Sequence, residues 1–281
     1  MGIKENVEKS VFVLREVKAR YKNPAILASF GKDSTAILNL CIDTFGEIPF
    51  PVVHLDTSYK FPEMYEIRDK LEKEMGFNLI IHKNEEALTN GCSKEKCGSF
   101  ECCHQLKTMN LKKLLKKYKF DALLVGIRRD ECGVRNEENY FSPRDNDCNF
   151  KQIEVTGEGR TNEDIGVKSL TDMELSGWGL YATEYKDSNH TRIHPLLHWS
   201  EAEIWEYLKQ KNASMCSLYF SKNGKRFRSL GCAPCTESIE SEASNFDEVI
   251  EEIKNTQIKE RSGRNLDKEN QMEMLRSLGY M

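Results

Sequence analysis

Short apolar runs and longer amphipathic stretches alternate along the first half of the chain. Apolar residues at helical spacing predict helices, and short apolar runs bounded by turn residues predict buried strands. Strands are predicted at residues 25–28, 50–55, 77–82 and 122–127, and helices at 6–21, 33–44, 63–75 and 106–118. Because strands that alternate with helices form parallel sheets with right-handed crossovers, we expect an α/β fold with a doubly wound, mainly parallel sheet.

The second half of the chain carries a weaker pattern. Residues 132–189 are polar and rich in Gly, Asn and Asp, which predicts a long irregular insertion. An ordered segment at 192–197 and a helix at 201–209 are expected next, followed by a cysteine-containing loop and helices at 246–259 and 268–278. We therefore expect one α/β domain, residues 1–215, and a C-terminal helical extension, residues 216–281, that packs on it.

Composition narrows the class of protein. The chain has 281 residues, 39% hydrophobic and 31% charged, and a net charge of −4, which favours a globular protein over a generally basic nucleic-acid coat. Residues 1–9 carry charges of both signs without an apolar core, so we expect no signal peptide. The longest apolar run, at 122–127, is too short to span a bilayer. A cytoplasmic location and no membrane partner are therefore expected.

The loop between the first predicted strand and its helix is suited to polyphosphate. A helix N-terminus offers free N–H groups and a partial positive charge, and Gly31 lets a ligand approach the backbone. The spacing differs from a Walker A loop, because Asp33 separates Lys32 from Ser34. An ordinary capped helix is the alternative interpretation. The candidate phosphate-binding residues are Ser29, Phe30, Gly31, Lys32, Asp33, Ser34 and Thr35.

This loop resembles the SGGxDS loop of the PP-loop ATP pyrophosphatases, which implies a fold of the adenine nucleotide alpha hydrolase type. The form with Phe30 is most similar to the small subunit of sulfate adenylyltransferases. Four later segments are similar to motifs of the same family in the same order, so the resemblance fails mainly across residues 132–189. These segments are residues 54–65, 120–131, 195–207 and 260–264.

The resemblance implies that the loop holds the β and γ phosphates of ATP. Lys32 and Asp33 would belong to the catalytic group. Leu55 and Asp56 would lie near the nucleotide, and Asp56 is also placed to reach Mg²⁺ through water. Mg²⁺ itself would bridge phosphate oxygens.

The resemblance also assigns roles to arginines beyond the loop. Arg128 and Arg129, after Gly126, would neutralise charge on the α phosphate or on the incoming oxyanion, where a fixed guanidinium is most effective. Arg261 and Arg264 would close over the site from the C-terminal part of the chain. A surface ion pair is the alternative for any one of these arginines.

The ten cysteines are a second source of chemistry. Because structural disulfides are not expected in a reducing compartment, the cysteines are more consistent with metal binding or redox chemistry. The pair Cys102-Cys103 and the later Cys232-Ala-Pro-Cys235 resemble the adenylyl-sulfate reductase pattern that holds one [4Fe–4S] cluster. Cys92 and Cys97 are substitutes for these ligands, and zinc or free redox thiols are alternatives. The cysteine near the C-terminus that such reductases use as nucleophile has no counterpart here.

A sulfate-activation motif set with a reductase-like cysteine set is similar to the ATP pyrophosphatase components of DNA phosphorothioation systems. That resemblance implies cleavage of ATP to AMP and pyrophosphate, DNA as the acceptor and a cysteine desulfurase as partner. The lysines of the helix predicted at 106–118 are compatible with phosphate contacts. The alternatives are a sulfate adenylyltransferase small subunit with a GTPase large subunit, a tRNA thiolation enzyme, and a catalytically silent scaffold that docks a desulfurase. A homodimer is compatible with each.

Overall fold

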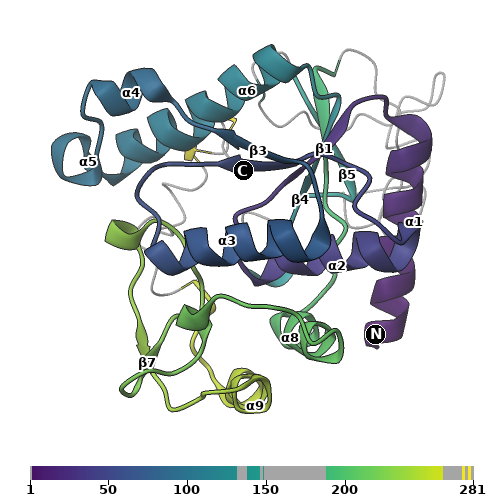
Figure 1. The fold of residues 1–281 in the computed structure, drawn as a ribbon, viewed down its shortest axis with the longest axis vertical. Coiled ribbons are helices and arrows are strands. Elements are labelled where there is room, and N and C mark those ends of the chain that lie inside the picture. Colours follow the sequence, from purple (N-terminus) through teal and green to yellow (C-terminus); the bar gives the residue numbers. More distant parts are fainter. Residues whose placement is uncertain are drawn as a thin grey trace, which may run out of the picture.

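The computed structural model describes residues 2–131, 138–145, 148, 188–261, 274–275 and 278–279. Its centre is a six-stranded sheet with the strand order β3-β2-β1-β4-β6-β5 (Figure 1). β5 runs antiparallel to β6, and the other neighbours are parallel, which confirms the expected sheet. The strands are β1 (Pro24–Leu27), β2 (Val52–Leu55), β3 (Leu79–His82), β4 (Ala122–Val125), β5 (Phe141–Arg144) and β6 (His190–Ile193).

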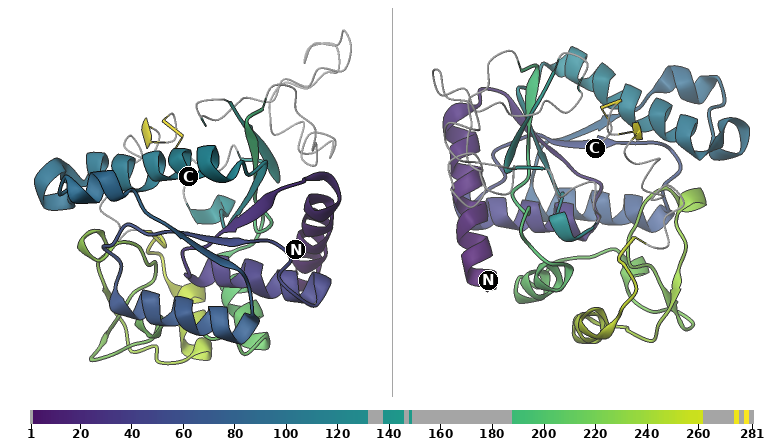
Figure 2. Two further views of the ribbon diagram at one scale, coloured as in Figure 1. Left: turned by 45° about the horizontal axis from the view of Figure 1, so that its top comes forward. Right: turned by 180° about the vertical axis from the view of Figure 1, so that it is seen from behind.

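Helices cover both faces of the sheet (Figure 2). Along β1, Ile26 packs into the core beneath the larger helix layer, whereas Ala25 and Leu27 face the opposite core. This alternation follows from the two-residue period of a strand. The larger helix layer contains α1 (Ile3–Arg20), α2 (Lys32–Phe45), α3 (Pro62–Met75) and α8 (Glu201–Gln210). Helix α9 (Phe246–Asn255) packs on α8. Helix α6 (Asn110–Tyr118) covers the opposite face of the sheet.

The strand order reverses at β1, which has β2 on one side and β4 on the other. The chain leaves β1 towards α2, and it leaves β4 towards the short helix η2 (Arg129–Glu131). In open parallel sheets, ligands bind where the loops diverge at such a reversal. The topology therefore places a candidate site between the ends of β1 and β4.

The structure corrects two predictions about irregular segments. The insertion predicted at 132–189 contains β5, an edge strand of the sheet that pairs antiparallel with β6. The cysteine-rich loop expected before α6 is largely helical, and Asn84 and Ser93 accept backbone hydrogen bonds as N-caps of two of its helices. These helices are α4 (Glu85–Thr89), α5 (Lys94–Cys103) and the π-helix η1 (His104–Met109), which runs directly into α6.

The segment after α8 is mostly extended and carries the second cysteine motif. It consists of η4 (Ser217–Tyr219), β7 (Lys225–Arg226), η5 (Ala233–Cys235) and β8 (Ile239–Glu240). The helix predicted to reach residue 259 ends at Asn255. Most of the helix predicted at 268–278 lies outside the described residues. In the described part of the chain, every helix is too short or too polar to cross a bilayer.

Candidate functional site

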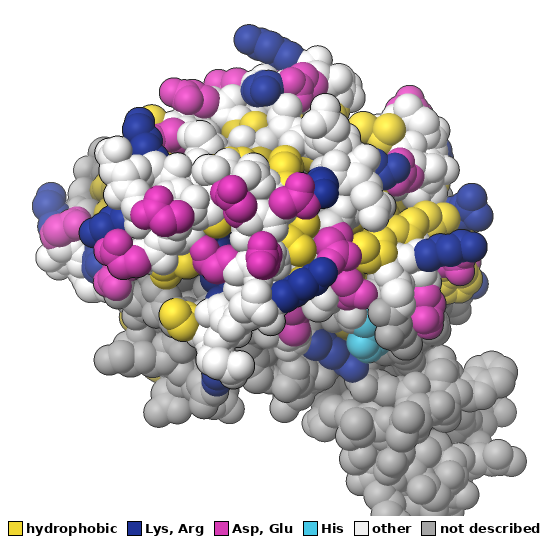
Figure 3. Space-filling model, turned by 90° about the horizontal axis from the view of Figure 1, so that it is seen from below, with side chains coloured by type: hydrophobic (Ala, Val, Ile, Leu, Met, Phe, Trp, Pro, Cys, Tyr) yellow, Lys and Arg dark blue, Asp and Glu magenta, His cyan; other side chains and the backbone are white. Residues whose placement is uncertain are grey.

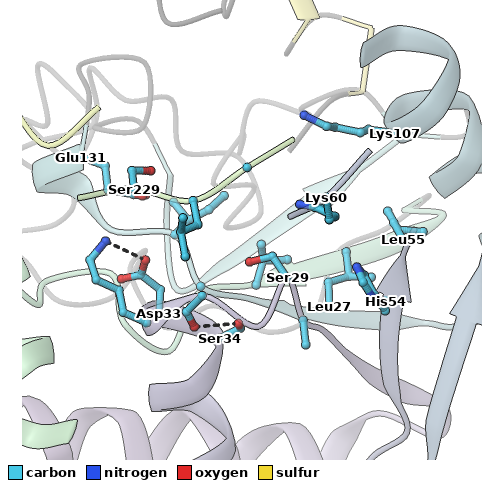
Figure 4. A pocket seen from close by; sticks show the side chains of 18 of the residues that line it. Leu27, Ser29, Asp33, Ser34, His54, Leu55, Lys60, Lys107, Glu131 and Ser229 are labelled. Atoms are coloured by element: carbon cyan, nitrogen blue, oxygen red, sulfur yellow. Dashed lines mark hydrogen bonds and ion pairs between the residues drawn. The ribbon is translucent and has the colours of Figure 1, made fainter. Parts of the chain in front are cut away.

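A pocket of ≈1050 Å³, open to solvent, lies at the reversal of the strand order (Figure 4). The carboxyl ends of β1, β2 and β4 form its floor, and residues 229–231 and Tyr219 approach from the second half of the chain. The structure brings most of the predicted nucleotide-binding residues together in its wall. These are Ser29, Gly31, Lys32, Asp33, Ser34, Leu55, Gly126 and Arg261.

The loop after β1 bends sharply at Phe30, which has a φ of 60°. A non-glycine residue in this left-handed region is strained, and burial of the phenyl ring offsets the strain. The ring lies against His54 and Phe77, with centroids 5.4 and 6.2 Å away, and is fully buried. Phe30 therefore shapes the loop from below and does not line the pocket. Thr35 is likewise buried inside α2.

Gly31 is required for space. A Cβ atom at this position would lie 2.8 Å from the hydroxyl oxygen of Tyr219. That hydroxyl accepts a hydrogen bond of 3.0 Å from the Lys32 amide, at the first turn of α2. Gly126 is equally restricted, because its Cβ would meet the Asp33 Cβ at 3.0 Å. The backbone at the α2 N-terminus is thus uncovered by side chains where a phosphate would bind.

Two buried cations meet one buried carboxylate at this helix N-terminus. Lys32 and Arg128, 1% and 0% exposed, both donate hydrogen bonds to Glu260, which is 8% exposed. Arg128 also donates to Asp33 Oδ1 at 2.8 Å and pairs with Asp130. Burial alone would raise the pKa of Glu260, but Arg128 and Lys32 outweigh it and hold that pKa well below its usual range.

The same charges keep both cations protonated. Burial opposes the charge on Lys32, but Asp33 and Glu260 raise its pKa above the ordinary value. Burial likewise opposes the charge on Arg128, and Glu260 followed by Asp33 raises its pKa. Lys32 therefore lines the pocket with a permanent positive charge, whereas Arg128 is fully buried, does not line the pocket and pairs with three carboxylates. Fixed positive charges of this kind at a helix N-terminus favour binding of a polyphosphate.

Three carboxylates are close enough to share a divalent cation. Oxygen atoms of Asp33, Glu131 and Glu260 all lie within 4.8 Å of one another. Oxygen ligands of this kind suit Mg²⁺, which binds one or two carboxylates together with phosphate oxygens. Arg261 lies 3.6 Å from Glu131, so the C-terminal segment contributes charge of both signs.

Two predicted catalytic residues lie elsewhere. Asp56 is buried and does not line the pocket; it accepts hydrogen bonds from the Ser58 amide and the Tyr65 hydroxyl, each at 2.8 Å. Burial raises the pKa of Asp56, but these two hydrogen bonds reverse the effect and lower it overall. Arg129 is turned away and donates to the Glu138 carbonyl at 2.7 Å. Arg264 lies outside the described residues.

Local sequence patterns do not identify several residues that belong to the site. Glu260 belongs to the same C-terminal motif as Arg261, but its role depends on reaching Lys32 across 228 residues. Tyr219 reaches the loop across 187 residues. Lys60 and Lys107 line the side of the pocket opposite Asp33 and add positive charge there (Figure 4).

Comparison with known proteins assigns a family to this pocket and fold. Residues 23–238 match the phosphoadenosine phosphosulfate reductase domain. The chain belongs to this family. Relatives named sulfate adenylyltransferase subunit 2 match nearly its whole length: that of Pseudoalteromonas translucida is 34% identical over 96% of both chains, and that of Geotalea uraniireducens is 36% identical over 96% of this chain and 95% of the relative.

Two solved structures share the fold at lower identity. The phosphoadenylyl-sulfate reductase of Candida auris superposes with a TM-score of 0.52, at 17% identity, over 79% of this chain and 90% of that one. The FMN adenylyltransferase of Candida glabrata in complex with ATP gives 0.54, at 17% identity, over 83% and 62%. These likenesses support the fold that the sheet topology shows.

A second, smaller pocket of ≈300 Å³ lies beside the nucleotide pocket in this member of the family. Thr57 and Lys107 line both pockets and so form a shared wall. The Thr57 hydroxyl lies 3.2 Å from the Cys232 sulfur. All four thiols predicted as cluster ligands line the smaller pocket, and we refer to it as the thiol cavity: Cys102, Cys103, Cys232 and Cys235.

The thiol cavity joins two distant parts of the chain. Cys102 and Cys103 end α5, whereas Cys232 and Cys235 flank and end η5. The Ala233 amide donates to the Tyr59 carbonyl at 2.7 Å, which fixes the second motif beside the end of β2. Burial, followed by the neighbouring thiol Cys103, raises the pKa of the Cys102 thiol. A soft metal or cluster is the usual group that four convergent thiols hold.

Proposed function

We propose that this protein cleaves ATP between the α and β phosphates and transfers the adenylyl group to an oxyanion acceptor, namely sulfate. The observation that carries this proposal is the pair of buried cations, Lys32 and Arg128, fixed at the N-terminus of α2. The relatives named sulfate adenylyltransferase subunit 2 support sulfate as the acceptor, because they match nearly the whole chain.

Different residues of the site would contact different phosphates of ATP. The N–H groups of α2 and the ammonium of Lys32 bind the β and γ phosphates, which leave as pyrophosphate. Arg128 lies closer to β4 and neutralises charge that builds on the α phosphate during attack. Asp33 and Glu131 would hold a divalent cation, which would supply positive charge to the phosphates.

The relatives are named as subunits, so we further propose a larger partner subunit for this chain. The predicted GTPase large subunit fits this proposal. The loop, Lys32 and the candidate cation ligands of the described site all come from this one chain.

A second candidate function is favoured by the thiol cavity. Four thiols in a cavity that shares Thr57 and Lys107 with the ATP pocket suit an enzyme that adenylylates an acceptor and then inserts sulfur, with DNA as the predicted acceptor. A [4Fe–4S] cluster fits the donor set, and when bound it would fix both cysteine segments and supply a redox or sulfur-handling centre. The face carrying α8 and α9 mixes acidic and basic side chains (Figure 3), so a nucleic acid would contact the opposite, lysine-bearing side at α6.

One experiment separates the two candidates. Anaerobically purified protein is analysed for iron, sulfide and zinc, and pyrophosphate release from ATP is measured with sulfate, with DNA and with neither. Turnover that requires sulfate supports adenylyl sulfate formation. Turnover that requires DNA, with about four irons per chain, supports the second candidate. ATP turnover to ADP, or none under any condition, would overturn both.

A further inference from the structure

Two cysteines outside the thiol cavity are placed as a reactive pair. The sulfur atoms of Cys92 and Cys97 lie 3.3 Å apart, and both side chains are partly exposed. Neither residue lines the thiol cavity, so the four predicted cluster ligands leave this pair unused. A disulfide requires an approach to about 2.05 Å, so only a small movement separates these thiols from bond formation.

The backbone around the pair permits such a movement. Gly91 and Gly98 bracket the segment with φ values of 71° and 79°, and Gly98 interrupts the regular geometry of α5. Glycine hinges of this kind let a short segment rotate without straining its flanks. On the inner side, the Tyr59 hydroxyl donates to the Cys92 carbonyl at 3.0 Å and keeps the pair beside the cavity wall.

The pair adjoins the thiol cavity. Cys102 is close enough to Cys92 to act on its pKa, which burial, followed by Cys97, raises to about 11. Cys102 lines the thiol cavity, whose Thr57 and Lys107 also line the nucleotide pocket. The pair is thus connected through Cys102 to the thiol cavity and to the two residues that this cavity shares with the nucleotide pocket.

We propose that Cys92 and Cys97 form a dithiol that accepts sulfane sulfur from a persulfide and releases it as sulfide beside the thiol cavity. One thiolate attacks the outer sulfur of the donor R–S–SH, which leaves as R–SH, and a persulfide forms on that cysteine. The other thiolate attacks the inner sulfur of this persulfide and expels hydrogen sulfide. The balance is R–S–SH plus two thiols giving R–SH, H₂S and one disulfide.

Electrons balance within these reactants. The sulfane sulfur gains two electrons and the two cysteine sulfurs lose one each, so no further oxidant is needed. A dithiol reductant restores the pair for the next turnover. Use of the sulfide by an adenylylated acceptor rests on the second candidate function, whereas its release does not.

The test uses the full-length, anaerobically purified protein with glutathione persulfide as the donor. Sulfide is quantified, and the peptides that contain Cys92 and Cys97 are examined by mass spectrometry without reduction. We expect one sulfide and one Cys92–Cys97 disulfide per chain. Single Cys92→Ser and Cys97→Ser variants should release sulfide at least about tenfold more slowly, and at least one should retain an extra sulfur atom on its remaining thiol.

The matched control is Cys216→Ala, which removes a buried thiol elsewhere in the chain and should leave sulfide release unchanged. Iron content and ATP cleavage are measured on every variant. Sulfide release at the wild-type rate in both single variants would overturn the proposal. So would loss of iron in Cys92→Ser, because that result assigns the pair to metal ligation. Sulfide release by a protein that does not cleave ATP would overturn the proposed function alone.

Discussion

Glu260 is the residue on which the charge balance of the nucleotide site depends. Its carboxylate bridges Lys32 and Arg128, which are both buried and both held in the charged form. Removing one member of a buried ion pair is much more costly than exchanging the whole pair, because a buried charge then lacks a counter-charge. The site is therefore sensitive to this carboxylate even before ATP is bound.

We expect Glu260→Gln to lower the free energy of unfolding by about 3 kcal/mol, measured by urea denaturation. ATP should raise the thermal midpoint more in this variant than in the wild type, because phosphate charge replaces the lost carboxylate. Glu251→Gln, at an exposed position of α9, is the control and should change stability by less than about 0.5 kcal/mol. Equal stability of the two variants would contradict this view of Glu260.

At the scale of elements, the junction of β1 and α2 was predictable from local pattern. The apolar run 25–28 and the following Gly-Lys-Asp-Ser indicate a strand, a phosphate loop and a helix in that order, and the structure has them. The helical cysteine segment before α6 was missed because α5 has almost no apolar stripe to give a helical period. Capping by Ser93 and tertiary contacts decide its conformation instead.

The Gly31–Tyr219 contact yields a prediction for this junction. Gly31→Ala should weaken binding of a non-hydrolysable ATP analogue about tenfold, close to 1.4 kcal/mol, because the new methyl group meets the Tyr219 hydroxyl. Calorimetric titration measures the change. Adding Tyr219→Phe removes that oxygen, so the double variant should recover most of the affinity lost by Gly31→Ala. Unchanged affinity in the alanine variant would show that the loop relaxes freely.

For the whole molecule, the parallel sheet and the approach of residues 29–34 to residue 126 follow from the alternation of strands and helices, whereas the resemblance alone placed Arg261 at the site. A reversal at β1 brings the ends of β1 and β4 together whatever the intervening loops do. Contacts that span most of the chain, such as Tyr219 with Lys32, have no counterpart in local pattern. Asp56 and Arg129 have side chains of the types that catalysis uses, but both make hydrogen bonds to other parts of the protein and do not face the pocket.

Buried histidines predict how the stability of the whole molecule depends on pH. Burial lowers the pKa of His54 to about 3, of His190 to about 2 and of His194 to about 4. The unfolded chain, with a histidine pKa near 6.5, therefore binds more protons than the folded chain below that pH. Stability should be fully present above pH 6.5 and fall towards pH 4, by about 1.4 kcal/mol per pH unit for each histidine.

Urea denaturation between pH 7 and pH 4.5 measures this slope. His54→Leu removes one titrating group, whose two ring nitrogens have no hydrogen-bond partner. We expect the variant to lose about one third of the slope, because one of three such histidines is gone. An unchanged slope would mean that His54 titrates alike in the folded and unfolded chains.

The bridge made by Glu260 also bears on the order in which the ribosome makes the chain. Lys32 and Arg128 are synthesised 228 and 132 residues before their shared carboxylate. A nascent chain that has completed most of the sheet still holds two cations in positions that the finished protein buries. Asp33 and Asp130 pair with these cations earlier, but the carboxylate that joins the two is added only when residue 260 is made, so the charge balance of the site is completed late in synthesis.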